Sequence, residues 1–103
     1  MNELPSVRDN VQRHRFEIEL GGGEFAFAAY HLLPGAIRFY HTEVPDSHGG
    51  KGLGTLLIRA GLRAARERGM KVIPVCPFFA AYLRKHPEEQ DLVDPEHLHL
   101  IQG

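Results

Sequence analysis

The chain has 103 residues and a mass of 11.6 kDa, with 43% hydrophobic residues, 24% charged residues and a formal charge of −1. This length holds one domain and excludes the large enzyme scaffolds, and the composition is that of a globular protein with a core. The charge argues against nucleic acid or an anionic membrane as a partner, and no apolar run approaches the roughly 18 residues of a membrane span. The polar start Met1-Asn2-Glu3 lacks the charged segment followed by an apolar segment that is typical of a signal peptide, so we expect a cytoplasmic protein. We expect it to be a monomer or a weak dimer.

The first half of the chain has the pattern of an antiparallel meander. Apolar residues alternate with polar ones from His14 up to Gly21-Gly22-Gly23, and an aromatic-rich extended run follows this glycine turn. A second turn at Leu33-Pro34-Gly35 precedes a third run, residues 37–44, which ends at Pro45. The pattern predicts three consecutive antiparallel strands.

The second half changes to a helical period. A stripe of apolar residues with helical spacing begins at Leu53 and ends near Gly69, and arginines occupy the opposite side. Residues 71–76 form a short apolar run, and Pro77 is well placed as the first residue of another helix, which closes at His86-Pro87. Strand, helix and strand in this order predict a parallel crossover.

These elements predict an α+β fold with a mixed, mostly antiparallel sheet of about five strands and two main helices. We expect the domain at residues 14–93, after a flexible N-terminus of residues 1–13. Residues 94–103 form a C-terminal tail, in which residues 98–101 are expected to add an extended segment. The acidic residues between Glu88 and Glu96 are expected to be solvated.

The most specific local pattern is the glycine-dense turn from His48 to Thr55. Glycines allow a ligand to approach the backbone closely, and the first amides of the following helix lack internal partners at the positive end of its dipole. Such a turn suits a phosphate or diphosphate. The spacing excludes a Walker loop, because Pro45 occupies the position of that motif's first glycine. It also excludes a Rossmann turn, because Thr55 occupies the position of that motif's third glycine. The alternative is a flexible loop that precedes a helix.

Positive charge is concentrated behind this turn. The residues that carry it are Lys51, Arg59, Arg63, Arg66, Arg68 and Lys71, with Glu67 as the opposing charge. This concentration favours a local anion site with Lys51 as a phosphate ligand. The arginines of the helix are individually explained as a solvated face.

The strand end Val44-Pro45, the turn and the amphipathic helix resemble the acyl-CoA-binding motif of the GCN5-related N-acetyltransferases, Arg/Gln-x-x-Gly-x-Gly/Ala. The segments 41–45, 72–78 and 86–88 are similar to the minimal single-domain family of acetyltransferase-like proteins. The resemblance implies a splayed sheet with acetyl-CoA as co-substrate, its diphosphate on the turn and its pantetheine along the strand that ends at Val44. The cofactor-binding residues would be Val44, Gly49, Gly50, Lys51, Gly52, Leu53, Gly54 and Thr55. Gly49 stands at the family's Arg/Gln position, which removes a side chain but keeps the backbone donors.

Cys76 is the one cysteine of the sequence, and it lies between a predicted strand and the Pro77 helix start. A helix N-terminus would stabilise its thiolate. The resemblance implies a part in acyl transfer, as an acylated nucleophile or as a group that polarises the thioester. The alternative is a small buried hydrophobic residue.

His41 and Glu43 lie two apart on one predicted strand and so share a face. His41 is a candidate base for Cys76 or for the incoming amine, and Glu43 is the second choice, at the place where the wider superfamily often has a base. Tyr82 matches the position of the superfamily's tyrosine that protonates the departing thiolate. The alternatives are polar surface residues for the first two and a half-buried aromatic for Tyr82. His97 and His99 lack a third ligand, so no metal is expected.

We therefore expect an acetyl-CoA-dependent N-acetyltransferase that modifies an amine of a small molecule or a protein. A second hypothesis is a non-catalytic acyl-CoA-binding module or sensor, since the chain lacks the extra N-terminal helices that wall the acceptor pocket in larger relatives. A third is a small partner-binding domain that uses its acidic tail.

Overall fold

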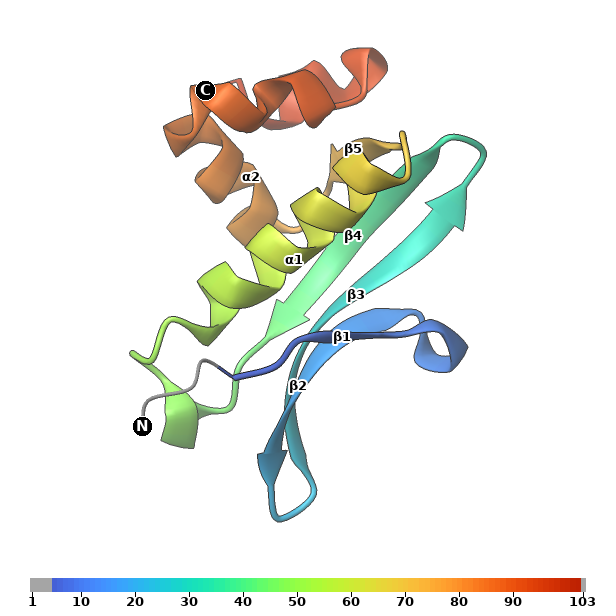
Figure 1. The fold of residues 1–103 in the computed structure, drawn as a ribbon. Helices are drawn as coiled ribbons and strands as arrows, with labels where there is room; N and C mark the ends of the chain where they lie inside the picture. The colour runs from blue at the N-terminus through green and yellow to red at the C-terminus, as the bar shows by residue number, and fades with distance from the viewer. Residues whose placement is uncertain (1–4, 103) are drawn as a thin grey trace.

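A computed structural model describes residues 5–102, which form an α+β fold (Figure 1). The sheet has five strands in the order β1-β2-β3-β4-β5. The strands are β1 Arg8–Asn10, β2 Arg15–Gly21, β3 Glu24–Leu33, β4 Ala36–Glu43 and β5 Lys71–Pro74. The helices are α1 Leu53–Glu67 and α2 Pro77–Lys85. The predicted fold class is confirmed.

Strands β2, β3 and β4 form the predicted meander, in which each strand is antiparallel to the next. Gly22 and Gly23 turn the first hairpin with φ of 61° and 82°, and Gly35 turns the second with φ of 72°. These left-handed conformations are open to glycine without a steric penalty, which explains the positions of the turns. The longest strands, β3 and β4, form the centre of the sheet.

Helix α1 is the crossover between β4 and β5, which are parallel as predicted. Both helices pack on Phe39 of β4, whose ring stacks on Phe79 of α2 with the ring centroids 4.2 Å apart. Gly61 allows α1 to approach the Phe39 ring, because a Cβ atom at position 61 would lie 2.7 Å from Cζ of Phe39. The core thus lies between the helices and one face of the sheet.

The register of β4 shifts in the middle of the strand. Phe39 pairs with Tyr30 and His41 pairs with Ala29, so Tyr40 is an extra residue without a partner on β3. Such a bulge changes which side chains face the core. Beyond it, Thr42 is buried on the side of the helices, whereas His41 and Glu43 are exposed.

The pairing of β4 with β5 ends at this bulge. The last pair in the register is Phe39 with Pro74, and the Cys76 amide then donates to the Phe39 carbonyl at 2.8 Å. From there the chain turns into α2, while β4 continues to Glu43. The sheet therefore opens between these two segments, next to the start of α1.

The tail after α2 differs from the prediction. Residues 98–101 are not extended, because Pro95–Leu100 forms a 3₁₀ helix in which the Ile101 amide donates to the Leu98 carbonyl at 3.1 Å. Proline at the first helical position favours this conformation. A second 3₁₀ helix, Pro87–Leu92, carries acidic residues that were expected to be merely solvated, but Arg66 binds two of them.

The segment before residue 14 also differs from the expected flexible N-terminus. Residues 8–10 form β1 and pair with β2, and a 3₁₀ turn, Val11–Arg13, follows. Asp9 fixes this strand, since it accepts hydrogen bonds from Tyr30 at 2.6 Å and from Arg68 at 2.8 Å. Residues 1–4 lie outside the described residues. Across residues 5–102, neither helix combines the length and apolar character that crossing a membrane requires.

Candidate functional site

The glycine-dense turn leads from the end of β4 into α1 through a short 3₁₀ helix, Asp46–His48. Gly52 is the N-cap of α1 with φ of 74°, and it provides no side chain to cap the helix. Leu56 is the first residue whose amide bonds back, to the Gly52 carbonyl at 3.1 Å. The amides of residues 53–55 therefore have no intrahelical partners and offer donors at the positive end of the helix dipole.

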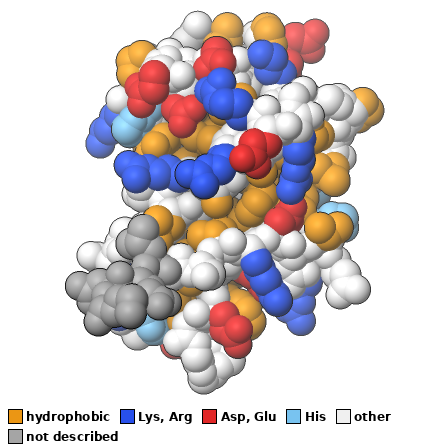
Figure 2. Space-filling view, viewed as in Figure 1, with side chains coloured by type: hydrophobic (Ala, Val, Ile, Leu, Met, Phe, Trp, Pro, Cys, Tyr) orange, Lys and Arg blue, Asp and Glu red, His pale blue; other side chains and the backbone are white. Residues whose placement is uncertain are grey.

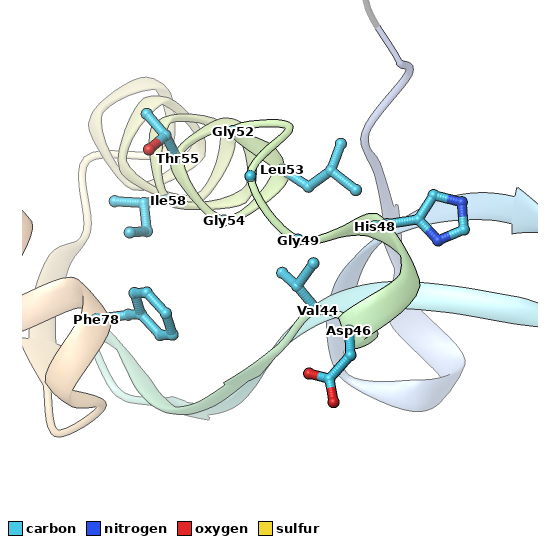
Figure 3. A pocket seen from close by; sticks show the side chains of 11 residues that line it. Val44, Asp46, His48, Gly49, Gly52, Leu53, Gly54, Thr55, Ile58 and Phe78 are labelled. Carbon is cyan, nitrogen blue, oxygen red and sulfur yellow. The ribbon is translucent and has the colours of Figure 1, made fainter.

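A cavity of about 390 Å³ lies against these amides (Figure 3). Seven of the eight predicted cofactor-binding residues line it, namely Val44, Gly49, Gly50, Gly52, Leu53, Gly54 and Thr55. Lys51 is exposed and does not belong to the lining. The missing side chains of the glycines leave the backbone open to a ligand, and Gly54 is so close to the end of β4 that a Cβ atom would lie 4.0 Å from Val44.

Two lining groups were not predicted at the loop end of the cavity, Asp46 and His48. Figure 3 shows the Asp46 carboxylate directed away from Gly52 and Gly54, and the His48 ring at the outer edge. His48 shares a hydrogen bond of 3.1 Å with the Ser47 hydroxyl. The amides of α1 are therefore separated from Asp46, the one carboxylate that lines the cavity among residues 5–102.

The other end of the cavity is apolar. Ile58 of α1 and Phe78 of α2 form this end, and sequence reasoning did not select either of them. Phe78 is 56% exposed, whereas its neighbour Phe79 is fully buried. Adjacent helical residues point about 100° apart, so two consecutive phenylalanines at a helix start indicate that one of them can face away from the core. That signal was available in the sequence.

Cys76 lies at the predicted junction, as the N-cap residue of α2. Its side chain is 2% exposed, and its sulfur lies 3.2 Å from the hydroxyl oxygen of Thr42 on β4. Cys76 does not line the cavity beside the glycine turn. The sulfur is thus held beneath β4 on the helix side of the sheet, and it faces a hydroxyl rather than solvent.

His41 and Glu43 share a face, as predicted, with 3.3 Å between Nε2 of His41 and Oε1 of Glu43. Their side chains are 54% and 60% exposed, and the His41 ring lies 5.9 Å from that of Phe27 on β3. Since Thr42 between them faces the helices, the strand separates this pair from the Cys76 sulfur. The structure therefore groups His41 with Glu43, and Cys76 with Thr42.

Tyr82 lies one turn further along α2 than Phe78 and is half-buried. Its hydroxyl accepts a hydrogen bond from Nε of Arg59 at 3.3 Å, and its ring stacks on His86 with the centroids 3.9 Å apart. Tyr82 does not line the cavity of the glycine turn, and its role as a proton donor stays a prediction.

The model of the GCN5-related N-acetyltransferase family matches residues 15–92 of this sequence. The strand, glycine turn and helix described above lie inside this match. The chain belongs to the GCN5-related N-acetyltransferase family.

Similar proteins include Protein NATD1 of several vertebrates. The mouse protein is 31% identical over 88 residues, which cover 84% of this chain and 80% of the relative. The chicken protein is 31% identical over 94 residues, which cover 89% of this chain and 83% of the relative. The NMR solution structure of a GCN5-like protein from Staphylococcus aureus superimposes with a TM-score of 0.67 at 28% identity, covering 91% of this chain and 95% of that one.

Proposed function

We propose that this protein binds acetyl-CoA and transfers its acetyl group to an amine. The observation that carries the proposal is the cavity at the start of α1, where glycines and uncapped amides meet the end of β4. A diphosphate matches this site, because oriented amides and a helix N-terminus favour negative charge. Lys51 adds positive charge at the exposed side of the turn.

The pantetheine arm would follow β4 toward the bulge, where β4 and β5 separate. This path leads the thioester to the part of β4 that carries His41 and Glu43 on its open face. An amine that approaches from this face would meet both groups before it meets the thioester. The cofactor would thus lie on the helix side of the sheet, and the amine would reach the thioester from the open side, where β4 and β5 separate.

In this reaction the amine nitrogen attacks the thioester carbonyl carbon, the carbon–sulfur bond breaks, and an amide forms. The proton that the amine loses passes to His41 or Glu43, and coenzyme A takes up a proton to leave as a thiol. Binding both reactants on the two sides of one strand end supplies most of the catalysis through proximity. Tyr82 remains the predicted donor of the proton to the thiolate.

A covalent route through Cys76 is the alternative. Its thiolate would attack the thioester carbonyl carbon and displace coenzyme A as a thiolate, which forms an S-acetyl cysteine. The amine would then attack this acetyl group, form the amide and release the Cys76 thiolate. The burial of this sulfur behind Thr42 favours direct transfer over the covalent route. Intact-mass measurement after incubation with acetyl-CoA decides between the two, because the covalent route adds one acetyl group that the Cys76→Ala variant does not gain.

Calorimetric titration with acetyl-CoA tests the proposal, with Gly54→Asp and Gly54→Asn as a matched pair. Gly54 has no positive φ and has room for a side chain, so both variants should fold. A carboxylate in the first turn stabilises a helix but repels a diphosphate. We expect Gly54→Asp to bind at least about 10-fold more weakly than Gly54→Asn, since each charged contact is worth roughly 1.5–3 kcal/mol.

No heat from the wild-type protein at millimolar acetyl-CoA would overturn the proposal. Binding without acetyl transfer to a panel of lysine peptides and polyamines would favour the non-catalytic module instead. The exposure of the His41 and Glu43 side chains favours the non-catalytic module, because neither side chain is enclosed in a pocket that would hold the acceptor.

A further inference from the structure

A hollow of about 470 Å³ lies between α1 and the chain that leads into β1, on the other side of α1 from α2 (Figure 1). We call it the α1 groove. Its sheet side is formed by Val7 and Phe16, and its helix side by Leu56, Arg59, Ala60, Arg63, Ala64 and Glu67. None of these residues lines the cavity of the glycine turn, so the α1 groove is a separate place on the protein.

The helix side of the α1 groove is one continuous stripe of α1. Its members follow each other from Leu56 to Glu67 at the spacing of a single helix face. At a rise of about 1.5 Å per residue, this stripe is about 16 Å long. Ala60 and Ala64 lie in its middle, and their short side chains allow another helix to approach α1 closely. The groove therefore has the length and shape to receive a helix of about three turns.

The floor of the α1 groove is apolar and incompletely covered. Phe16 and Ala64 are buried, but Val7, Leu56 and Ala60 are only partly buried although they pack against the core. Figure 2 shows apolar atoms at the surface on this face, next to a row of charged side chains that runs over α1. Bound small molecules usually bury most of their surface, which a groove this open does not provide. An amphipathic helix needs to bury only one face and keeps its polar face in water, so it matches the groove better.

Two charged side chains on the helix side of the groove, Arg63 and Glu67, are exposed. Among residues 5–102 neither of them forms an ion pair, although they lie one helical turn apart and have opposite charges. Arg66, on another face of the same helix, is bound by Glu89 and Asp91 at 2.9 Å each. The chain thus neutralises the arginine outside the groove and leaves the charges beside the apolar floor available to a partner.

We propose that the α1 groove binds an amphipathic helix of a partner protein, with a carboxylate against Arg63 and a basic side chain, one turn away, against Glu67. The apolar stripe of this helix would cover the exposed floor. Because the groove presents one charge of each sign in a fixed order, the order of charges on the partner decides which helices it accepts. Arg59 also lines the groove, but it is already bound to the Tyr82 hydroxyl at 3.3 Å, so Arg63 and Glu67 carry this selectivity.

Fluorescence anisotropy with two designed peptides of about 15 residues, each held helical by a side-chain lactam bridge, tests the proposal. Both peptides carry the same stripe of leucines, and they differ only in the order of one glutamate and one lysine placed one turn apart beside it. We expect the wild-type protein to bind one peptide at least about 5-fold more tightly, since both charge pairs are attractive with one order and repulsive with the other. The double variant Arg63→Glu, Glu67→Arg should invert this preference.

Arg63→Glu alone should abolish the preference, because each peptide then meets one attractive and one repulsive group. Arg13→Glu is the matched control, since Arg13 is exposed in the 3₁₀ turn Val11–Arg13, outside the groove, and the change in net charge is the same. This variant should keep the wild-type preference. Ala60→Met fills the groove without a change in charge and should weaken the binding of both peptides.

The charge variants change exposed residues, so they should fold like the wild type, which circular dichroism checks. Equal affinity of the wild type for the two peptides overturns the proposal, as does a preference that the double variant keeps. If neither peptide binds and decanoate does, in a manner that Ala60→Met prevents, the groove belongs to a small amphipathic ligand and the proposal is wrong. No binding of either peptide at millimolar concentration overturns it as well.

Discussion

The two ends of α1 differ in how completely the protein satisfies them. At the N-terminal end, a glycine N-cap, uncapped amides and a cavity meet the end of β4. At the C-terminal end, Arg66 binds Glu89 and Asp91, and Arg68 binds Asp9 at 2.8 Å. One end offers hydrogen-bond donors to a ligand, whereas the other uses charged side chains to hold distant segments.

This difference shows which end of α1 is held in place by ion pairs. The Arg66 guanidinium holds the pKa of Asp91 below its usual range, and Asp91 and Glu89 in turn raise the pKa of Arg66. These pairs tie α1 to the segment after α2, and Asp9 ties it to β1. A helix that is fixed at one end and in its middle can leave its other end open for binding.

Gly61→Ala tests the fixed middle of the helix and should have the largest effect. Its Cβ atom would lie 2.7 Å from Phe39, whose ring cannot move away because it is stacked on Phe79. Overpacking of this kind costs roughly 1–3 kcal/mol, which outweighs the helix propensity that alanine gains. We expect a free energy of unfolding lowered by about 2 kcal/mol in urea titrations. An unchanged midpoint would contradict the packing described here.

Tyr30→Phe tests the fixed end with a smaller expected effect. The hydroxyl of Tyr30 donates to Asp9, and its loss leaves a partly buried carboxylate with one partner fewer. We expect about 1 kcal/mol of destabilisation at pH 7. Tyr40→Phe is the control, because that ring is 41% exposed, and it should unfold like the wild type.

The same tyrosine predicts a pH dependence. Burial and the hydrogen bond to Asp9 raise the pKa of Tyr30 well above its usual value. In the unfolded chain tyrosine loses its proton near pH 10, while folded Tyr30 keeps it, so this stabilisation is present below about pH 10 and declines above it. The free energy of unfolding of Tyr30→Phe should therefore decrease less steeply with pH, between about pH 10 and 11, than that of the wild type. Parallel curves for the two proteins would contradict the raised pKa.

Most elements of the fold could be predicted because their signals are local. The glycine turns, the apolar stripe of α1 and the proline that starts α2 each determine a short segment by itself. The strand β1 could not be predicted, because it is held in place by hydrogen bonds of Asp9 with Tyr30 and Arg68, which lie far along the chain. The final 3₁₀ helix was mistaken for an extended segment because its few residues show no helical period.

The placement of the candidate-site residues could be predicted where one contiguous segment of backbone lines the cavity, and not where side chains from separate elements meet. Seven predicted residues of the turn line one cavity, as expected for a contiguous segment. The bulge at Tyr40 left no sequence signal, although it decides that Thr42 faces the helices and His41 faces the opposite side. The contact of Thr42 with Cys76 depends on how β4 and the start of α2 pack, which no local pattern reveals.

Gly54→Ala sharpens the comparison with the smallest change in stability. Unlike Gly61, Gly54 has space for a Cβ atom, at an ordinary contact distance of 4.0 Å from Val44. Alanine should raise the free energy of unfolding by about 0.5 kcal/mol, less than in a helix interior because the residue is in the first turn. The same methyl group narrows the passage between α1 and β4, so we expect acetyl-CoA to bind several-fold more weakly in calorimetry. A variant that gains stability with unchanged affinity would contradict cofactor binding at the open end of α1, whereas higher stability with weaker binding would show that its glycine is kept for binding at the expense of the helix.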